Sequence, residues 1–195
     1  MSPTTPTQHP APRTRPTPPT AAATLRKLYF LRFGFAAGWA ALLFTTADAL
    51  GPLSATLLVL YPAFDVACAI VDIRSTRANG GPVRGLYANV ALSTLTAIGL
   101  TVAVTSGIPA VLHVWGAWAV TAGLVQLTVG AARRRLGGQW AMIASGAIST
   151  LAGASFITQA NRGDAALTSL SGYALLGGVF FLVTALRLNH TPTDS

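Results

Sequence analysis

The chain has 195 residues, of which 52% are hydrophobic and 9% are charged, and its formal net charge is +8 at pH 7. A soluble domain carries about 25% charged residues, so this composition excludes an ordinary soluble domain and indicates a surface that faces lipid. The excess of cations does not indicate nucleic-acid binding, because it lies in short segments between apolar runs, without a basic helix face or an aromatic platform for bases.

The first segment, residues 1–25, contains seven prolines and seven threonines and almost no large apolar side chain. Such a segment cannot bury enough surface to offset the entropy lost on ordering, so we predict a disordered cytoplasmic tail. The run Arg15-Pro16-Thr17-Pro18-Pro19 could also dock on an aromatic groove of a partner, but a solvated tail is the commoner outcome for this composition.

Six apolar runs follow the tail, and each has about the 20 residues that a helix needs to cross roughly 30 Å of hydrocarbon. We therefore predict an all-α polytopic membrane protein, with six transmembrane helices within residues 26–189 and a short cytoplasmic tail over residues 190–195. The predicted spans are Leu28–Thr46, Leu53–Ile73, Leu86–Ser106, Ala110–Ala132, Trp140–Thr158 and Leu167–Leu188.

The first run also imitates a secretory signal, because Arg26 and Lys27 precede it and Ala47-Asp48-Ala49 follows it as a possible cleavage motif. The apolar region of a signal peptide is only about 7–15 residues long. This run is longer and starts after a proline-rich tail, so we interpret it as a membrane span.

The basic residues lie almost entirely on one side of this topology. With a cytoplasmic N-terminus, twelve of the thirteen Lys and Arg residues lie inside, and only Arg162 lies outside. This asymmetry predicts that both termini are cytoplasmic and that the inner loops contact anionic lipid headgroups. Arg outnumbers Lys twelve to one, which fits a GC-rich bacterial genome. We therefore expect the six spans to lie in the inner membrane of a bacterial cell.

Aromatic residues predict that the six helices form three repeated hairpins. One aromatic residue opens each odd-numbered span, and a second lies in the outer half of the following span. The pairs are Tyr29 with Tyr61, Tyr87 with Trp118 and Trp140 with Tyr173. All three hairpins enter from the same side, so they would be parallel repeats about an axis normal to the membrane. The alternative is the weak periodicity that interfacial aromatic residues give to any protein with six spans.

Small residues mark helix faces that can pack closely. Lipid gives helices no hydrophobic reason to associate, so close backbone approach must supply the contact energy. Such faces could hold the bundle together or form a homo-oligomer, and the first use is favoured for a compact protein. They contain Gly34 and Gly38 in the first span, Gly116, Gly123 and Gly130 in the fourth, Ser145, Ser149 and Gly153 in the fifth, and Gly177 and Gly178 in the sixth.

The three hairpins, the glycine-marked even spans and a span that opens on Trp140 six residues before Gly146 resemble the HdeD-type family of small bacterial membrane proteins. The resemblance covers about residues 28–188. It implies a six-helix membrane protein associated with acid resistance, and it supplies no catalytic residues. The proline-rich tail and the acidic second span depart from the family pattern.

Asp65 is the strongest candidate for a functional group, because it lies about 12 Å from the inner end of the second span. An ionisable side chain at that depth should face the protein interior and have a partner. Arg32 in the first span and Asn89 in the third lie at reachable depths. The cluster could fix three helices through a buried ion pair or form a proton or cation site. The ion pair is favoured, because a transporter would offer more than one polar group within the membrane.

His113 lies at the outer start of the fourth span, beside Trp115 and Trp118. A histidine there could report acidification, since histidine changes charge between about pH 5 and 8. An interfacial histidine beside tryptophan more often anchors a helix end.

Two other polar residues are expected to have structural partners. Asp72, seven residues after Asp65 and on the same helix face, is expected to pair with Arg74 or Arg77 at the inner surface. Gln126 is expected to form a hydrogen bond across helices.

The sequence shows no catalytic or metal-binding arrangement. No Ser, His and acidic residue lie within reach at one membrane depth, and the single Cys68 and the three separated histidines provide neither a disulfide nor a metal site. We therefore predict a non-enzymatic membrane protein without a cofactor. The alternative is a small transporter or channel that uses Asp65 as a proton or cation site.

Overall fold

The computed structural model describes residues 21–132, 134 and 139–187. Six long helices make up this part of the chain, and each is long and apolar enough to cross a membrane. They are α1 (Ala21–Thr45), α2 (Pro52–Ala78), α3 (Arg84–Ala103), α4 (Ile108–Ala132), α5 (Trp140–Arg162) and α6 (Thr168–Arg187). The prediction of an all-α polytopic membrane protein with six helices is confirmed.

The predicted helix boundaries differ from the observed ones mainly at the ends. α1 begins at Ala21, inside the segment that was expected to be disordered, because the alanines at 21–23 have the highest helix propensity of any residue. Residues 1–20 and the short predicted tail 190–195 lie outside the described residues. α2 continues to Ala78 and ends two residues before Gly80, whose φ of +70° a glycine adopts without strain.

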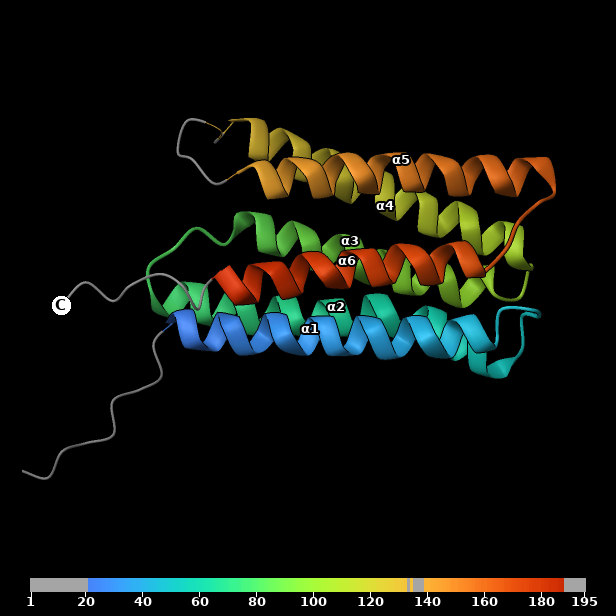
Figure 1. Cartoon of the computed structure of the whole chain (residues 1–195), viewed down its shortest axis with the longest axis horizontal. Helices are drawn as coiled ribbons and strands as arrows, with labels where there is room; N and C mark the ends of the chain where they lie inside the picture. The colour runs from blue at the N-terminus through green and yellow to red at the C-terminus, as the bar shows by residue number, and fades with distance from the viewer. Residues whose placement is uncertain (1–20, 133, 135–138, 188–195) are drawn as a thin grey trace, which may run out of the picture.

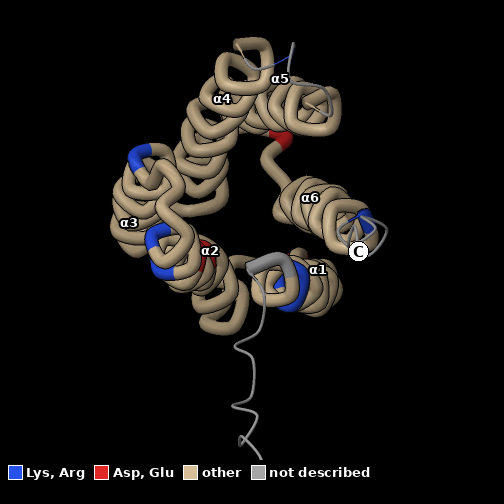
Figure 2. The backbone as a smooth tube through the Cα atoms, turned by 90° about the vertical axis from the view of Figure 1, so that its left-hand side faces the viewer, with Lys and Arg blue, Asp and Glu red and all other residues tan. Residues whose placement is uncertain are grey.

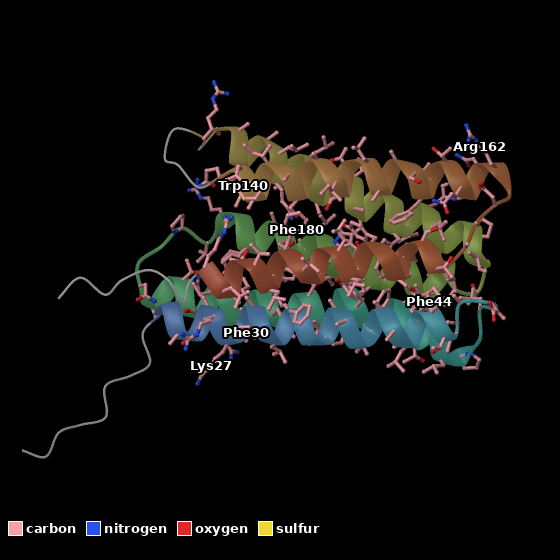
Figure 3. All side chains as sticks on the ribbon, viewed as in Figure 1. Lys27, Phe30, Phe44, Trp140, Arg162 and Phe180 are labelled. Carbon is pink, nitrogen blue, oxygen red and sulfur yellow. The ribbon has the colours of Figure 1, made fainter. Side chains whose placement is uncertain are left out.

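The start of α1 and the end of α6 lie at the same end of the bundle, which we call the terminal end (Figure 1). Lys27 and Trp140 also lie at this end, whereas Arg162 lies at the opposite end, which we call the far end (Figure 3).

The helices form a ring in chain order, and α6 closes the ring against α1 (Figure 2). The most extensive contacts are those of α4 with α5, α6 with α1 and α2 with α3, and they alternate with smaller contacts of α1 with α2, α3 with α4 and α5 with α6. The helices of each predicted hairpin are therefore neighbours, but each helix packs most closely on a helix of the adjacent hairpin. The sequence repeat itself stays a prediction.

The hydrophobic core of the described chain lies in the far half of the ring. Each odd helix contributes residues from its second half and each even helix residues from its first half. The largest fully buried members are Leu43, Leu58, Leu100, Val111, Leu112, Trp115, Leu167 and Leu170. The terminal half also has buried apolar residues, such as Leu28, Ala69, Ile73 and Ala185, but they lie outside this cluster, so the two halves of the ring are packed differently.

α4 and α5 approach so closely that the backbone of one helix meets the backbone of the other. A Cβ atom added at Gly123 would lie 2.5 Å from Thr150 Oγ1 and 2.7 Å from the Gly146 carbonyl oxygen. A Cβ atom added at Gly153 would lie 2.6 Å from the Gly116 carbonyl oxygen. The predicted glycine face of α4 is therefore a packing surface within the bundle.

The GxxxG motif of α1 does not serve this purpose. Cβ atoms added at Gly34 and Gly38 would meet no atom within 4 Å, because both glycines are exposed on the outer side of the ring. Of the two uses that the sequence leaves open for such a face, close packing within the bundle therefore does not apply to this one. α1 instead packs on α6 through Ala36, which lies 3.0 Å from a Cβ atom built at Gly178.

We expect Gly123→Ala to lower the thermal stability of the detergent-solubilised protein, because the new methyl group must displace backbone atoms of α5. Overpacking of this kind costs about 1–3 kcal/mol. Gly34→Ala is the matched control, and it should leave stability unchanged or raise it by up to about 1 kcal/mol, since alanine is the better helix former. Equal effects of the two substitutions would show that the α4–α5 contact is looser than described.

Candidate functional site

Asp65 on α2 forms an ion pair with a side chain of α1 and accepts hydrogen bonds from two side chains of α3. Arg32 Nη1 on α1 lies 3.0 Å from Oδ1 of Asp65, while Asn89 Nδ2 and Ser93 Oγ on α3 donate to Oδ2 at 2.7 Å and 2.8 Å. The side chains of Arg32 and Asp65 are only 13% and 17% exposed. The structure thus brings together Asp65, Arg32 and Asn89. Because all the neighbours are donors, the arrangement suits an ionised carboxylate.

Ser93 is a member of this cluster that the sequence analysis did not single out. It lies four residues after Asn89, so both side chains project from one face of α3. That spacing could have indicated Ser93 as a partner of Asp65. It is a weak indication, because hydroxyl side chains in membrane helices commonly bond to their own helix. The adjacent Thr94 does so, since its hydroxyl donates to the Val90 carbonyl oxygen at 2.7 Å.

Arg32 also connects α1 to α6. Its guanidinium carbon lies 5.0 Å from the ring centroid of Phe181, within the range of a cation–π interaction. Tyr29, one turn earlier on α1, stacks on the same ring with the centroids 6.0 Å apart. Arg32 Nε is buried and has no hydrogen-bond partner among the described residues. The one arginine therefore contacts both neighbours of α1 in the ring.

A small, partly open cavity of about 30 Å³ adjoins the ion pair. About 10–15 Å³ of such volume is enough for one water molecule, so the cavity has room for about two. Its wall combines the two charged side chains with four aromatic rings. The lining residues are Arg32, Phe35, Tyr61, Phe64, Asp65 and Phe181.

An aromatic cluster crosses the ring on the far side of this cavity, and we call it the aromatic plug. It consists of Trp39 on α1, Tyr61 on α2, and Trp115 and Trp118 on α4, with ring centroids of contacting pairs 4.7–6.1 Å apart. Trp39 Nε1 donates to the Leu57 carbonyl oxygen at 2.6 Å. Because the plug joins helices on opposite sides of the ring, it fills the ring centre at this level.

His113 links the far ends of α4 and α5. Its Nδ1 lies 2.9 Å from the Pro109 carbonyl oxygen, and its Nε2 lies 3.0 Å from Asn161 Oδ1. A protonated ring donates in both contacts, and a neutral ring keeps both if the Asn161 amide turns to donate. Since either state preserves the link, this geometry favours the anchoring role over acid sensing.

The predicted ion pair of Asp72 with Arg74 or Arg77 is wrong. The carboxylate of Asp72 accepts from Thr76 Oγ1 at 3.3 Å, and neither arginine lies within ion-pairing distance of it. Residues two and five positions along a helix project from different faces, so these arginines point away from Asp72. The guanidinium of Arg77 instead lies over the ring of Tyr87, 5.5 Å from its centroid.

Gln126 also differs from its prediction. Its Oε1 is buried, with no hydrogen-bond partner in the described part of the chain, so this atom forms no hydrogen bond across helices. Cys68 is a buried free thiol. Among residues 21–132, 134 and 139–187, no group of three or more His, Cys, Asp or Glu side chains could hold a metal ion.

No protein-family model, curated protein or solved structure matches the chain. The resemblance to the HdeD-type family therefore stays a prediction from the sequence. The fold alone defines the class, which is a multi-pass membrane protein with six helices.

We expect Ser93→Ala to destabilise the detergent-solubilised protein by about 1.5–3 kcal/mol, because it removes a hydrogen bond to a buried charged group. Thr94→Ala is the control, since its hydroxyl bonds only to its own helix and a surface change of this kind is usually within about 0.5 kcal/mol. Thermal unfolding of the two variants gives the comparison. A Ser93→Ala protein as stable as the control would mean that Asp65 does not depend on this donor.

Proposed function

We propose that the protein is a non-enzymatic integral membrane protein in which the Arg32–Asp65 ion pair has a structural role. One observation carries this proposal: the carboxylate of Asp65 forms an ion pair with Arg32 and accepts two hydrogen bonds, from Asn89 and Ser93. The negative charge is therefore compensated by the protein itself, without a bound cation.

The ion pair determines how α1 and α2 are positioned relative to each other, because apolar packing between these two helices is limited. The contact of α1 with α2 is one of the smaller contacts around the ring. Arg32 and Asp65 fix the relative height and rotation of these two helices, because sliding or rotating either one would separate two buried charges. Asn89 and Ser93 extend the same constraint to α3.

We further propose that the terminal end of the ring faces the cytoplasm of a bacterial cell. Most Lys and Arg residues of the described chain lie at this end (Figure 2), which supports the positive-inside orientation and contact with anionic inner-leaflet lipids. A role in envelope or acid stress rests on the family resemblance alone. The open GxxxG face of α1 supports a homo-oligomer, since a second copy could approach it closely.

The structural role is tested by a double-mutant cycle on thermal stability in detergent. We expect Asp65→Ala to be strongly destabilising, because breaking a buried ion pair costs about 3–5 kcal/mol in soluble proteins. Asp65→Asn should fall between the native protein and Asp65→Ala, since it keeps hydrogen-bonding atoms without the charge. Arg32→Ala combined with Asp65→Ala should cost less than the sum of the two single changes.

Strict additivity of the two alanine substitutions would contradict the structural role, because residues that contact each other couple energetically. Gly34→Ala, on the outer side of α1, is the control partner for Asp65→Ala. That pair should be additive, because no atom contacts a Cβ at position 34.

A second candidate function is a small transporter or channel that uses Asp65. The observation that favours it is the cavity beside the ion pair, since a charged side chain that borders a cavity within a membrane is often part of a transport pathway. The aromatic plug argues against it, because the plug blocks the ring centre on the far side of Asp65.

Proteoliposomes distinguish the two functions. Vesicles that carry the protein should remain as tight to protons and monovalent cations as empty vesicles, as measured with a pH-sensitive dye and ion-selective electrodes. A flux that Asp65→Asn abolishes would establish the transport function instead. Asn79→Ala, an exposed change at the terminal end of α2, is the control that should leave any flux unchanged.

A further inference from the structure

We propose that the cavity beside Arg32 and Asp65 is a water-filled chamber that is connected to the terminal side of the membrane and closed to the far side. The occupant is water, because the volume of about 30 Å³ has room for about two molecules of that size and excludes larger solutes. This inference goes beyond the structural role of the ion pair and does not depend on it.

The chamber is closed toward the far side by two layers of side chains. The aromatic plug forms the layer next to the cavity, and its Tyr61 also lines the cavity. Trp39 and Trp115 of the plug already belong to the hydrophobic core, and the fully buried Leu43, Leu58 and Leu112 of the same core form the second layer. Water would have to cross both layers to reach Asp65 from the far side.

The chamber wall provides a polar group that requires a partner. Arg32 directs its Nη1 to Asp65 and its guanidinium face to Phe181, but its Nε–H is buried without a hydrogen-bond partner in the described chain. Buried donors in native proteins are almost always satisfied, by protein groups or by ordered water. Water in the adjoining cavity is small enough to accept this hydrogen bond and mobile enough to hydrate the carboxylate of Asp65.

A polar line connects the chamber to the terminal end. Asp72 lies seven residues after Asp65, which is close to two helical turns, so both carboxylates project from one face of α2. Asp72 is half-buried, has no ion pair among the described residues and lies near Tyr29, the neighbour of Arg32 on α1. The largest fully buried apolar side chains of the described chain lie in the far half, whereas the buried apolar residues of this half, such as Leu28, Ala69 and Ile73, are smaller or less completely buried. Apolar packing therefore closes the interior less completely here than in the far half.

Cysteine accessibility to silver ions tests the chamber, because Ag⁺ is close to water in size and reacts with thiols. Phe181→Cys, in a Cys68→Ala background, places a thiol on the chamber wall. Vesicles of both orientations are exposed to Ag⁺ with glutathione trapped inside, and the remaining free thiol is then measured with a maleimide after denaturation. We expect Ag⁺ applied from the terminal side to abolish maleimide labelling, and Ag⁺ applied from the far side to leave it intact.

Three matched variants in the same background calibrate the experiment. Leu43→Cys in the core should keep its maleimide labelling after Ag⁺ from either side. Ala78→Cys lies at the exposed terminal end of α2, so only Ag⁺ from the terminal side should block its maleimide labelling. Ala49→Cys lies in the exposed α1–α2 loop, so only Ag⁺ from the far side should block its labelling. In whole cells these two variants also report which end of the bundle is cytoplasmic.

Retention of the Phe181→Cys thiol after Ag⁺ from the terminal side would overturn the proposal, and so would its loss after Ag⁺ from the far side. If Phe181→Cys fails to fold, Phe35→Cys on the opposite wall is the replacement, with the same expected result. The outcome is independent of the stability cycle on Asp65, so the chamber and the structural role of the ion pair can fail separately.

Discussion

A carboxylate within the hydrocarbon region of a membrane must have a cation and hydrogen-bond donors, and this requirement organises the first half of the ring. Asp65 recruits a cation from α1 and two neutral donors from α3, so three consecutive helices share one polar centre. The guanidinium of Arg32 also contacts the ring of Phe181 and thereby connects the same centre to α6. The α4–α5 pair has no such centre and is held by backbone contact at glycines. One ring is thus stabilised by two different physical means.

The contrast between polar contacts and apolar packing also separates the terminal half of the bundle from the far half. In the far half, large aromatic and aliphatic side chains fill the centre, as expected where only dispersion and shape select the packing. In the terminal half, the charged and amide side chains need particular partners at fixed distances. Dense apolar packing around such groups would exclude any further partner for an atom that remains unpaired, such as Arg32 Nε. The cavity beside Arg32 lies where the polar side chains of the terminal half meet the aromatic plug.

The sequence predicts the fold well because span length and hydrophobicity are local properties. It also predicts that Asp65, Arg32 and Asn89 meet, because helix depth alone limits which polar residues can reach a buried carboxylate. The role of Ser93 and the Phe181 contact depend on helix rotation, which depth does not determine. The pairing of Asp72 was mistaken for the same reason, since the arginines near it in sequence lie on other faces of α2. The outward direction of Gly34 and Gly38 likewise follows only from how α1 is rotated in the ring.

The closure of the ring by α6 against α1 has a consequence for biogenesis. The chain is made from its N-terminus, so α1 enters the membrane first and its most extensive neighbour, α6, enters last. Until α6 has inserted, α1 can be held by the polar centre with α2 and α3 and by the contacts of Trp39 with Tyr61 and Leu57 on α2. Loss of the final helix, through a premature stop or cleavage, would leave the α1 surface around Ala36 facing lipid. The packing of α1 in this protein is therefore completed only when α6 inserts.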